Sequence, residues 1–250
     1  MRHHNDQKTV KPFKNRIVNA ARFLKQVMIY NVKIIFANKF IYFLLAAFLL
    51  FIAVITTNLF DENWYPDAAE AYSYLLFSGL LLIFYPAAFG IQNDLDTRMI
   101  ETLFGIPDYR FKVWFMRLIV VYFIVWVMLV IFAALSYWLL APVPIMELTL
   151  QLMFPIAFIG ALAFMLSTII RNGNGAAAIV IIFGITTWFS LGFFDTNPWN
   201  LFLNPFKTPD NLSYAIWIDI MFYNRLYLSI GTVLCILTGL YKLQNREQFI

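Results

Sequence analysis

Residues 118–140 read LIVVYFIVWVMLVIFAALSYWLL and contain no charged side chain. A helix needs about 20 apolar residues to cross the hydrocarbon core of a bilayer. Backbone groups in lipid must be hydrogen-bonded within a helix or a closed barrel, and barrel strands alternate apolar and polar residues. Because this run does not alternate, it predicts a transmembrane helix.

Five further apolar stretches lie at residues 40–59, 72–91, 148–170, 176–194 and 226–243. The chain is 62% hydrophobic and 13% charged, whereas ordinary soluble domains are about 25% charged. A soluble core could not bury so much apolar surface. We therefore expect an all-α integral membrane protein with six transmembrane helices. Its single domain, residues 1–250, would comprise a cytoplasmic or interfacial segment (1–39), a transmembrane region (40–243) and a tail (244–250).

The distribution of Lys and Arg predicts the orientation of these helices. With the amino terminus inside, all of the 18 basic residues except Lys207 and Arg225 fall on the inner side. Cytoplasmic connections carry such an excess. Both termini are thus expected in the cytoplasm, and the positive charge is not a sign of nucleic-acid binding.

Residues 14–39 fit a basic amphipathic helix, with Ile17, Leu24, Met28 and Ile35 on one stripe. Such a helix beside the inner leaflet usually lies in the interface and binds anionic lipid. Contact with a cytosolic partner is the alternative interpretation.

The largest inner connection, residues 92–117, contains a short apolar stripe of Leu95, Met99 and Leu103, which Pro107 ends. A short helix of this kind, held between two spans, can dock on another protein. It can also be a solvated loop whose charges only fix the topology.

The outer connection, residues 195–225, is interrupted by Pro198, Pro205 and Pro209, so one continuous helix is excluded. Its aromatic residues, among them Trp199, Phe206 and Trp217, are too apolar for a free loop. The segment either lies in the outer interface or dips into the protein, where irregular backbone is tolerated if protein surrounds it.

Motifs for chemistry within the chain are missing. The sequence has no GxxxxGK[ST] phosphate loop and no HExxH, GxSxG or CxxC. We expect no catalytic, metal-binding or cofactor-binding residues. The middles of the six expected spans carry no charge, which argues against a proton-coupled carrier. Asp94 and Asp96 are the nearest candidates for an enzyme site, but they adjoin Arg98 and no histidine.

The sequence Asp96-Thr97-Arg98-Met99-Ile100-Glu101-Thr102-Leu103-Phe104-Gly105-Ile106-Pro107 resembles the inner loop of exporter-type (type 2) ABC transporter permeases. The basic amino-terminal helix, the six spans, the outer aromatic segment and the charged tail extend this resemblance over nearly the whole chain. One departure is Met99, where many members of the family carry glycine.

The resemblance implies that transport and ATP hydrolysis are carried out by separate chains. A separate cytosolic ABC ATPase would hold ATP and Mg, and a second permease chain, the same or different, would complete the pore. The implied ATPase-coupling residues are Asp96, Thr97, Met99, Ile100, Glu101, Leu103 and Pro107. The short re-entrant helices of the family would correspond to the outer segment with Pro198, Trp199, Pro205, Phe206 and Trp217.

The expected function is therefore that of a permease subunit in a bacterial inner membrane. Its apolar walls fit an amphipathic or hydrophobic cargo, such as a peptide, a lipid or a drug. The alternatives are an accessory membrane subunit of a transport or immunity complex and an intramembrane lipid-modifying enzyme.

Overall fold

The computed structural model describes residues 40–59, 67–96, 110–189, 196–209 and 212–243. Within these ranges the regular elements are all helical. They are α2 (Phe40–Leu59), α3 (Ala68–Asp96), η1 (Arg110–Phe115), α5 (Met116–Leu139), α6 (Ile145–Ile170), α7 (Gly173–Phe189) and α9 (Tyr214–Lys242). The amphipathic helix expected at residues 14–39 and the tail at 244–250 lie outside the described residues.

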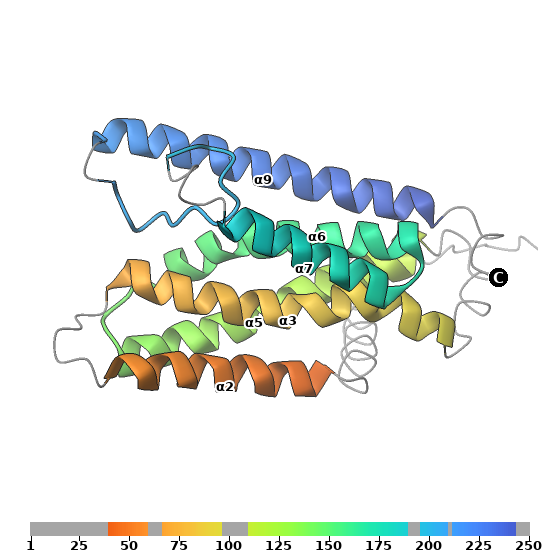
Figure 1. The fold of residues 1–250 in the computed structure, drawn as a ribbon, viewed down its shortest axis with the longest axis horizontal. Coiled ribbons are helices and arrows are strands. Elements are labelled where there is room, and N and C mark those ends of the chain that lie inside the picture. Colours follow the sequence, from red (N-terminus) through yellow and green to blue (C-terminus); the bar gives the residue numbers. More distant parts are fainter. Residues whose placement is uncertain (1–39, 60–66, 97–109, 190–195, 210–211, 244–250) are drawn as a thin grey trace, which may run out of the picture.

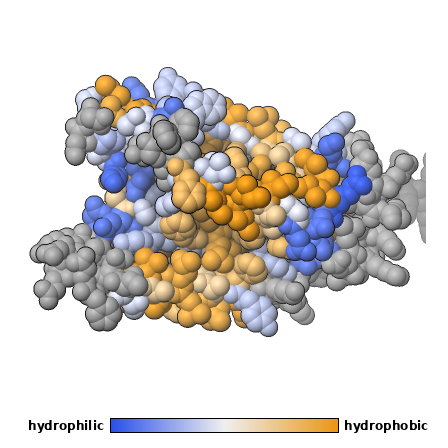
Figure 2. All heavy atoms as spheres, viewed as in Figure 1, coloured by the Kyte–Doolittle hydropathy of each residue, from blue (hydrophilic) through white to orange (hydrophobic). Residues whose placement is uncertain are grey.

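Four helical stretches are long and apolar enough to cross a membrane: Ala68–Asp94, Val113–Leu139, Ile145–Ile170 and Tyr214–Lys242. α2 and α7 are also apolar, but the stretches Phe40–Thr56 and Gly173–Phe189 are shorter. Figure 2 shows apolar residues gathered across the middle of one face, with polar residues toward its two ends. These features indicate a membrane protein, as the sequence predicts.

The helices run side by side along the long axis of the molecule (Figure 1). Helix α3 packs against α2, α5, α6 and α7, and α6 packs against α3, α5, α7 and α9. We call the end with residues 140–144 and 196–209 the outer end. The inner end carries the α6–α7 turn at Arg171 and Asn172 and the last turn of α9.

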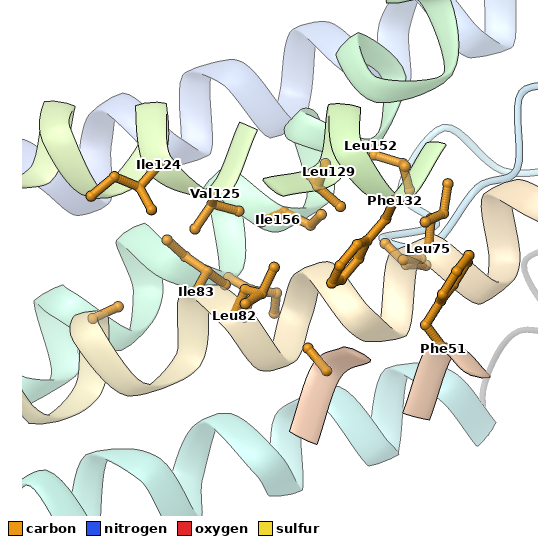
Figure 3. Packing of buried hydrophobic residues seen from close by; sticks show 14 of the residues in the cluster. Phe51, Leu75, Leu82, Ile83, Ile124, Val125, Leu129, Phe132, Leu152 and Ile156 are labelled. Atoms are coloured by element: carbon orange, nitrogen blue, oxygen red, sulfur yellow. The ribbon is translucent and has the colours of Figure 1, made fainter. Parts of the chain in front are cut away.

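Buried aliphatic side chains of α3, α5 and α6 form the centre of the core (Figure 3). Leu82, Val125, Leu129 and Ile156 are among them, and each is inaccessible to solvent. Helix α2 joins this core through Phe51, whose ring stacks on Phe132 of α5 with 5.4 Å between centroids.

Small residues let α3 and α6 approach closely. A Cβ at Gly160 of α6 would lie 2.5 Å from Cγ1 of Ile83, and one at Gly79 of α3 would collide with Ile156. Glycine removes this steric limit, as it does in many membrane helix pairs. The α3–α6 contact is therefore the fixed centre around which the other helices pack.

Most of the expected helices match, and α2 matches residue for residue. The last one differs, because α9 begins at Tyr214 rather than at residue 226. Trp217 and Arg225, expected in the outer connection, thus lie inside α9. Asn224 and Arg225, two polar residues of this stretch, donate hydrogen bonds to the 196–209 segment and to α6, so the helix accommodates them.

Candidate functional site

An apolar groove of 770 Å³ runs along α3, with α2 and α7 on its two sides. Phe43 of α2, Leu81 of α3 and Ile185 of α7 are among its lining residues, all of which are apolar. Gly184 also lines it, and a Cβ there would meet nothing within 4 Å. The groove can hold an apolar chain, but it offers no side chain for chemistry.

A smaller cavity of 260 Å³, which we call the outer chamber, lies at the outer end. Tyr72 and Ser73 of α3, Asn204 and Lys207 of the 196–209 segment, and Trp217 of α9 contribute to its wall. In contrast to the groove, the outer chamber combines hydroxyl, amide and ammonium groups with aromatic rings.

The groove and the outer chamber adjoin, because Trp188 of α7 and Phe202 line both of them. The two rings lie 5.9 Å apart between centroids, and Phe77 of α3 lies 4.9 Å from Trp188. An aromatic cluster thus separates an apolar space from a polar one.

The five aromatic and proline residues expected in the outer segment come together at this end. Asn224 Nδ2 donates to the carbonyl of Pro198 at 2.8 Å, and Trp217 Nε1 donates to that of Pro205 at 3.4 Å. Trp199 stacks on Tyr227 at 4.5 Å, and Phe206 lies 6.0 Å from Tyr72.

Side chains of the surrounding helices also satisfy the irregular backbone of residues 196–209. Asn224 Nδ2 donates to the carbonyl of Asn200 at 2.7 Å, besides its bond to Pro198. Asn204 Nδ2 donates to the carbonyl of Ala69 at 2.7 Å. These bonds supply partners that a non-helical backbone needs where water is scarce.

Arg225, which the sequence predicts in the outer connection, is a buried cation that is only 8% exposed. Its Nε donates to Gln151 Oε1 of α6 at 2.8 Å, and Nη1 donates to Asn224 Oδ1 at 3.0 Å. Nη2 donates to the carbonyl of Leu203 at 3.4 Å, and the guanidinium lies 5.5 Å from the centroid of the Phe154 ring. The one signal in the sequence was its isolation among apolar residues.

The span expected at residues 226–243 has no charge in its middle, but α9 begins at Tyr214 and therefore also contains Arg225. Apart from the adjacent Asn224, the partners of Arg225 come from α6 and from Leu203, so the sequence does not reveal them. Tyr72 lies beside the guanidinium, which can only donate, and its buried O–H finds no acceptor among the described residues. Arg225 also forms no ion pair within the described residues.

At the inner end, Arg117 of α5 pairs with Asp94 of α3 at 2.8 Å, and both side chains are largely buried. Arg117 also lies 5.2 Å from the centroid of the Trp114 ring. Two residues before Asp94, Gln92 Oε1 accepts a hydrogen bond from the backbone N–H of Gly173 at 2.7 Å, which joins the start of α7 to α3.

Of the expected coupling residues, Asp96 is the last residue of α3. Thr97, Met99, Ile100, Glu101, Leu103 and Pro107 lie outside the described residues. Asp94, a candidate for an enzyme site, is instead the partner of Arg117. Among the described residues there is no group of His, Cys, Asp and Glu side chains suited to a metal ion.

Comparison of the chain with family models, curated proteins and solved structures finds no match.

Proposed function

We propose that the chain is the transmembrane subunit of an ATP-driven exporter of the ABC type. It has six spans, with both termini in the cytoplasm of a bacterial cell, and forms the path for an amphipathic or hydrophobic cargo together with a second permease chain. A cytosolic ATPase binds and hydrolyses ATP, and this chain has no catalytic role of its own.

The link between the inner end and the groove carries this proposal. Asp94 and Arg117 join α3 to α5 on either side of the connection that resembles a coupling loop. Gln92, one turn from the end of α3, accepts a hydrogen bond from the first residue of α7. A displacement of that connection would therefore move α7, which is one side of the groove. This arrangement supports a coupling role.

The apolar lining of the groove supports the class of cargo. Its 770 Å³ lies in the range of small-molecule pockets, about 300–1,000 Å³. Its wall carries no charged side chain, and the indole N–H of Trp188 is the one hydrogen-bonding group among its lining residues, so it would desolvate a polar cargo almost without compensation. An apolar or amphipathic molecule has no such cost.

The proposal is tested by purifying the tagged chain from its host in mild detergent and identifying the proteins that come with it. We expect a stoichiometric cytosolic ATPase. Deletion of residues 97–104 should remove it, and Glu101→Lys should weaken its recovery, while both variants still insert in the membrane. Glu147→Lys, an exposed charge reversal in the first turn of α6, is the matched control and should retain the ATPase.

Recovery of the chain alone, or with membrane proteins only, would contradict the transporter proposal and favour an accessory subunit. Equal loss of the ATPase in the Glu147→Lys control would show that the deletion acts on the fold rather than on a docking loop.

A further inference from the structure

We infer that the groove and the outer chamber together form a binding site for one anionic amphiphile. The acyl chain lies in the groove, and the acidic head group, a phosphodiester, lies in the outer chamber. Both cavities belong to this chain alone. That the bound amphiphile is the cargo rests on the proposed function, whereas the binding itself does not.

The groove has the length of one leaflet. Its lining on α7 extends from Val180 to Phe189, which spans about 14 Å at 1.5 Å per residue. Half of a hydrocarbon core measures about 15 Å. An acyl chain lying along α7 would thus fill the groove from the aromatic cluster toward the middle of the bundle.

A buried hydroxyl without a partner marks the place of the head group. Tyr72 is 1% exposed and lines the outer chamber, yet its O–H has no acceptor among the described residues. Buried hydroxyls in folded proteins nearly always have one. An oxygen of a ligand in the chamber would supply the missing acceptor.

The charge around the outer chamber selects an anion. Lys207 lines it and forms no ion pair within the described residues, and Arg225, next to Tyr72, has only neutral hydrogen-bond partners. Two cations without a carboxylate partner in the described part of the chain leave a positive potential at the end of an apolar groove. A zwitterionic head group also carries a cation, which this positive potential would repel.

The aromatic cluster lies where head group and chain would meet. Trp188 and Phe202 line both cavities, and aromatic rings commonly occupy the boundary between apolar and polar surroundings in membranes. The site thus changes from apolar to polar along its length in the order that an amphiphile requires.

Native mass spectrometry of the detergent-solubilised full chain, titrated with dioleoyl phosphatidylglycerol or dioleoyl phosphatidylcholine, tests the inference. The two lipids share their acyl chains and differ in head-group charge. We expect one phosphatidylglycerol per chain to be retained, about tenfold more strongly than phosphatidylcholine, as a charge-assisted hydrogen bond would give. Glycerol 3-phosphate, which has the charge without the chain, should not compete.

Three substitutions separate the two halves of the site. Gly184→Phe fills the groove at a position with free space and should abolish retention. Ile182→Phe adds the same ring to α7 outside the groove and should leave retention unchanged. Tyr72→Phe removes a hydroxyl that has no acceptor among the described residues, so the fold should keep its stability while the affinity for phosphatidylglycerol falls about fivefold.

Equal retention of both lipids, or unchanged retention in Gly184→Phe, would overturn the inference, since annular lipid would then explain the binding. Competition by glycerol 3-phosphate would reveal a site for a soluble anion and would also overturn it. If Gly184→Phe changed only the proportion of dimers, the groove would be an interface between copies. None of these outcomes depends on an ATPase, so failure of the proposed function stays distinguishable.

Discussion

At the scale of single residues, Arg225 determines how the outer end is built. Its guanidinium bridges α6, α9 and the 196–209 segment through Gln151, Asn224 and the carbonyl of Leu203. A buried charge among neutral partners loses hydration, and only close donors and acceptors offset that loss. The hydrogen-bonded guanidinium of Arg225, which we call the arginine fork, thus holds the proline-containing segment 196–209 in place of regular secondary structure.

Removing this fork should loosen the outer end. We expect Arg225→Ala to lower the free energy of unfolding by about 2–4 kcal/mol, since three acceptors are left without their donor. Arg225→Lys should have an intermediate effect, because a single ammonium cannot reproduce the fork. Thermal unfolding in detergent measures both.

Lys242→Ala is the control, because this exposed lysine lies on the same helix. It should change the stability by no more than about 0.5 kcal/mol. Equal midpoints of thermal unfolding for Arg225→Ala and Lys242→Ala would show that Arg225 does not hold the outer end.

At the scale of elements, hydropathy predicted the existence of each helix better than its ends. It placed α2 correctly because its run is bounded by polar residues in the sequence itself. It cut α9 short because Asp219, Asn224 and Arg225 resemble a connection, and the sequence does not reveal that Asn224 bonds to the carbonyls of Pro198 and Asn200. The adjoining cavities, formed by α2, α3, α7 and the 196–209 segment, could not be predicted for the same reason.

The contact between α3 and α6 should tolerate no extra methyl group. Gly160→Ala places a Cβ against Ile83, and we expect it to destabilise the protein by about 1–3 kcal/mol through overpacking. Gly184→Ala on α7 is the matched control. With open space around its Cβ, it should leave the unfolding temperature unchanged or raise it. A reversed order of the two unfolding temperatures would refute the close α3–α6 contact.

The pair of Asp94 and Arg117 should act as one unit at the inner end. Asp94→Ala leaves the largely buried Arg117 without its partner, and we expect a loss of about 3–5 kcal/mol. The double substitution Asp94→Ala with Arg117→Leu should cost less than Asp94→Ala alone, because no unpaired charge remains. Chemical denaturation of the wild type, of Asp94→Ala, of Arg117→Leu and of the double variant measures the coupling, and strictly additive losses would exclude it.

At the scale of the whole molecule, α3 and α6 form a packed centre, whereas α9 is buried on one side only. Tyr214, Phe222, Leu234 and Leu237 of α9 are each more than half exposed. In water so much apolar surface would be a liability, and in a bilayer it faces acyl chains. The fold is therefore consistent as a whole only with lipid or further protein around it.

The proposed arrangement of six spans makes the two ends of the bundle accessible from opposite sides of the membrane. We replace Cys235, the one cysteine of the chain, by Ala and introduce single cysteines at the exposed positions Lys207, Arg171 and Lys242. In intact cells, a membrane-impermeant maleimide should label only Lys207→Cys. After permeabilisation, all three variants should react.

These results follow if every helix crosses the bilayer, because Lys207 lies at the outer end, and Arg171 and Lys242 lie at the inner end. The shorter apolar helices α2 and α7 are the critical ones. If α7 did not cross, Arg171 and Lys207 would be accessible from the same side. Labelling of Arg171→Cys in intact cells, with Lys242→Cys still protected, would therefore replace six spans by a topology in which α7 lies on the membrane.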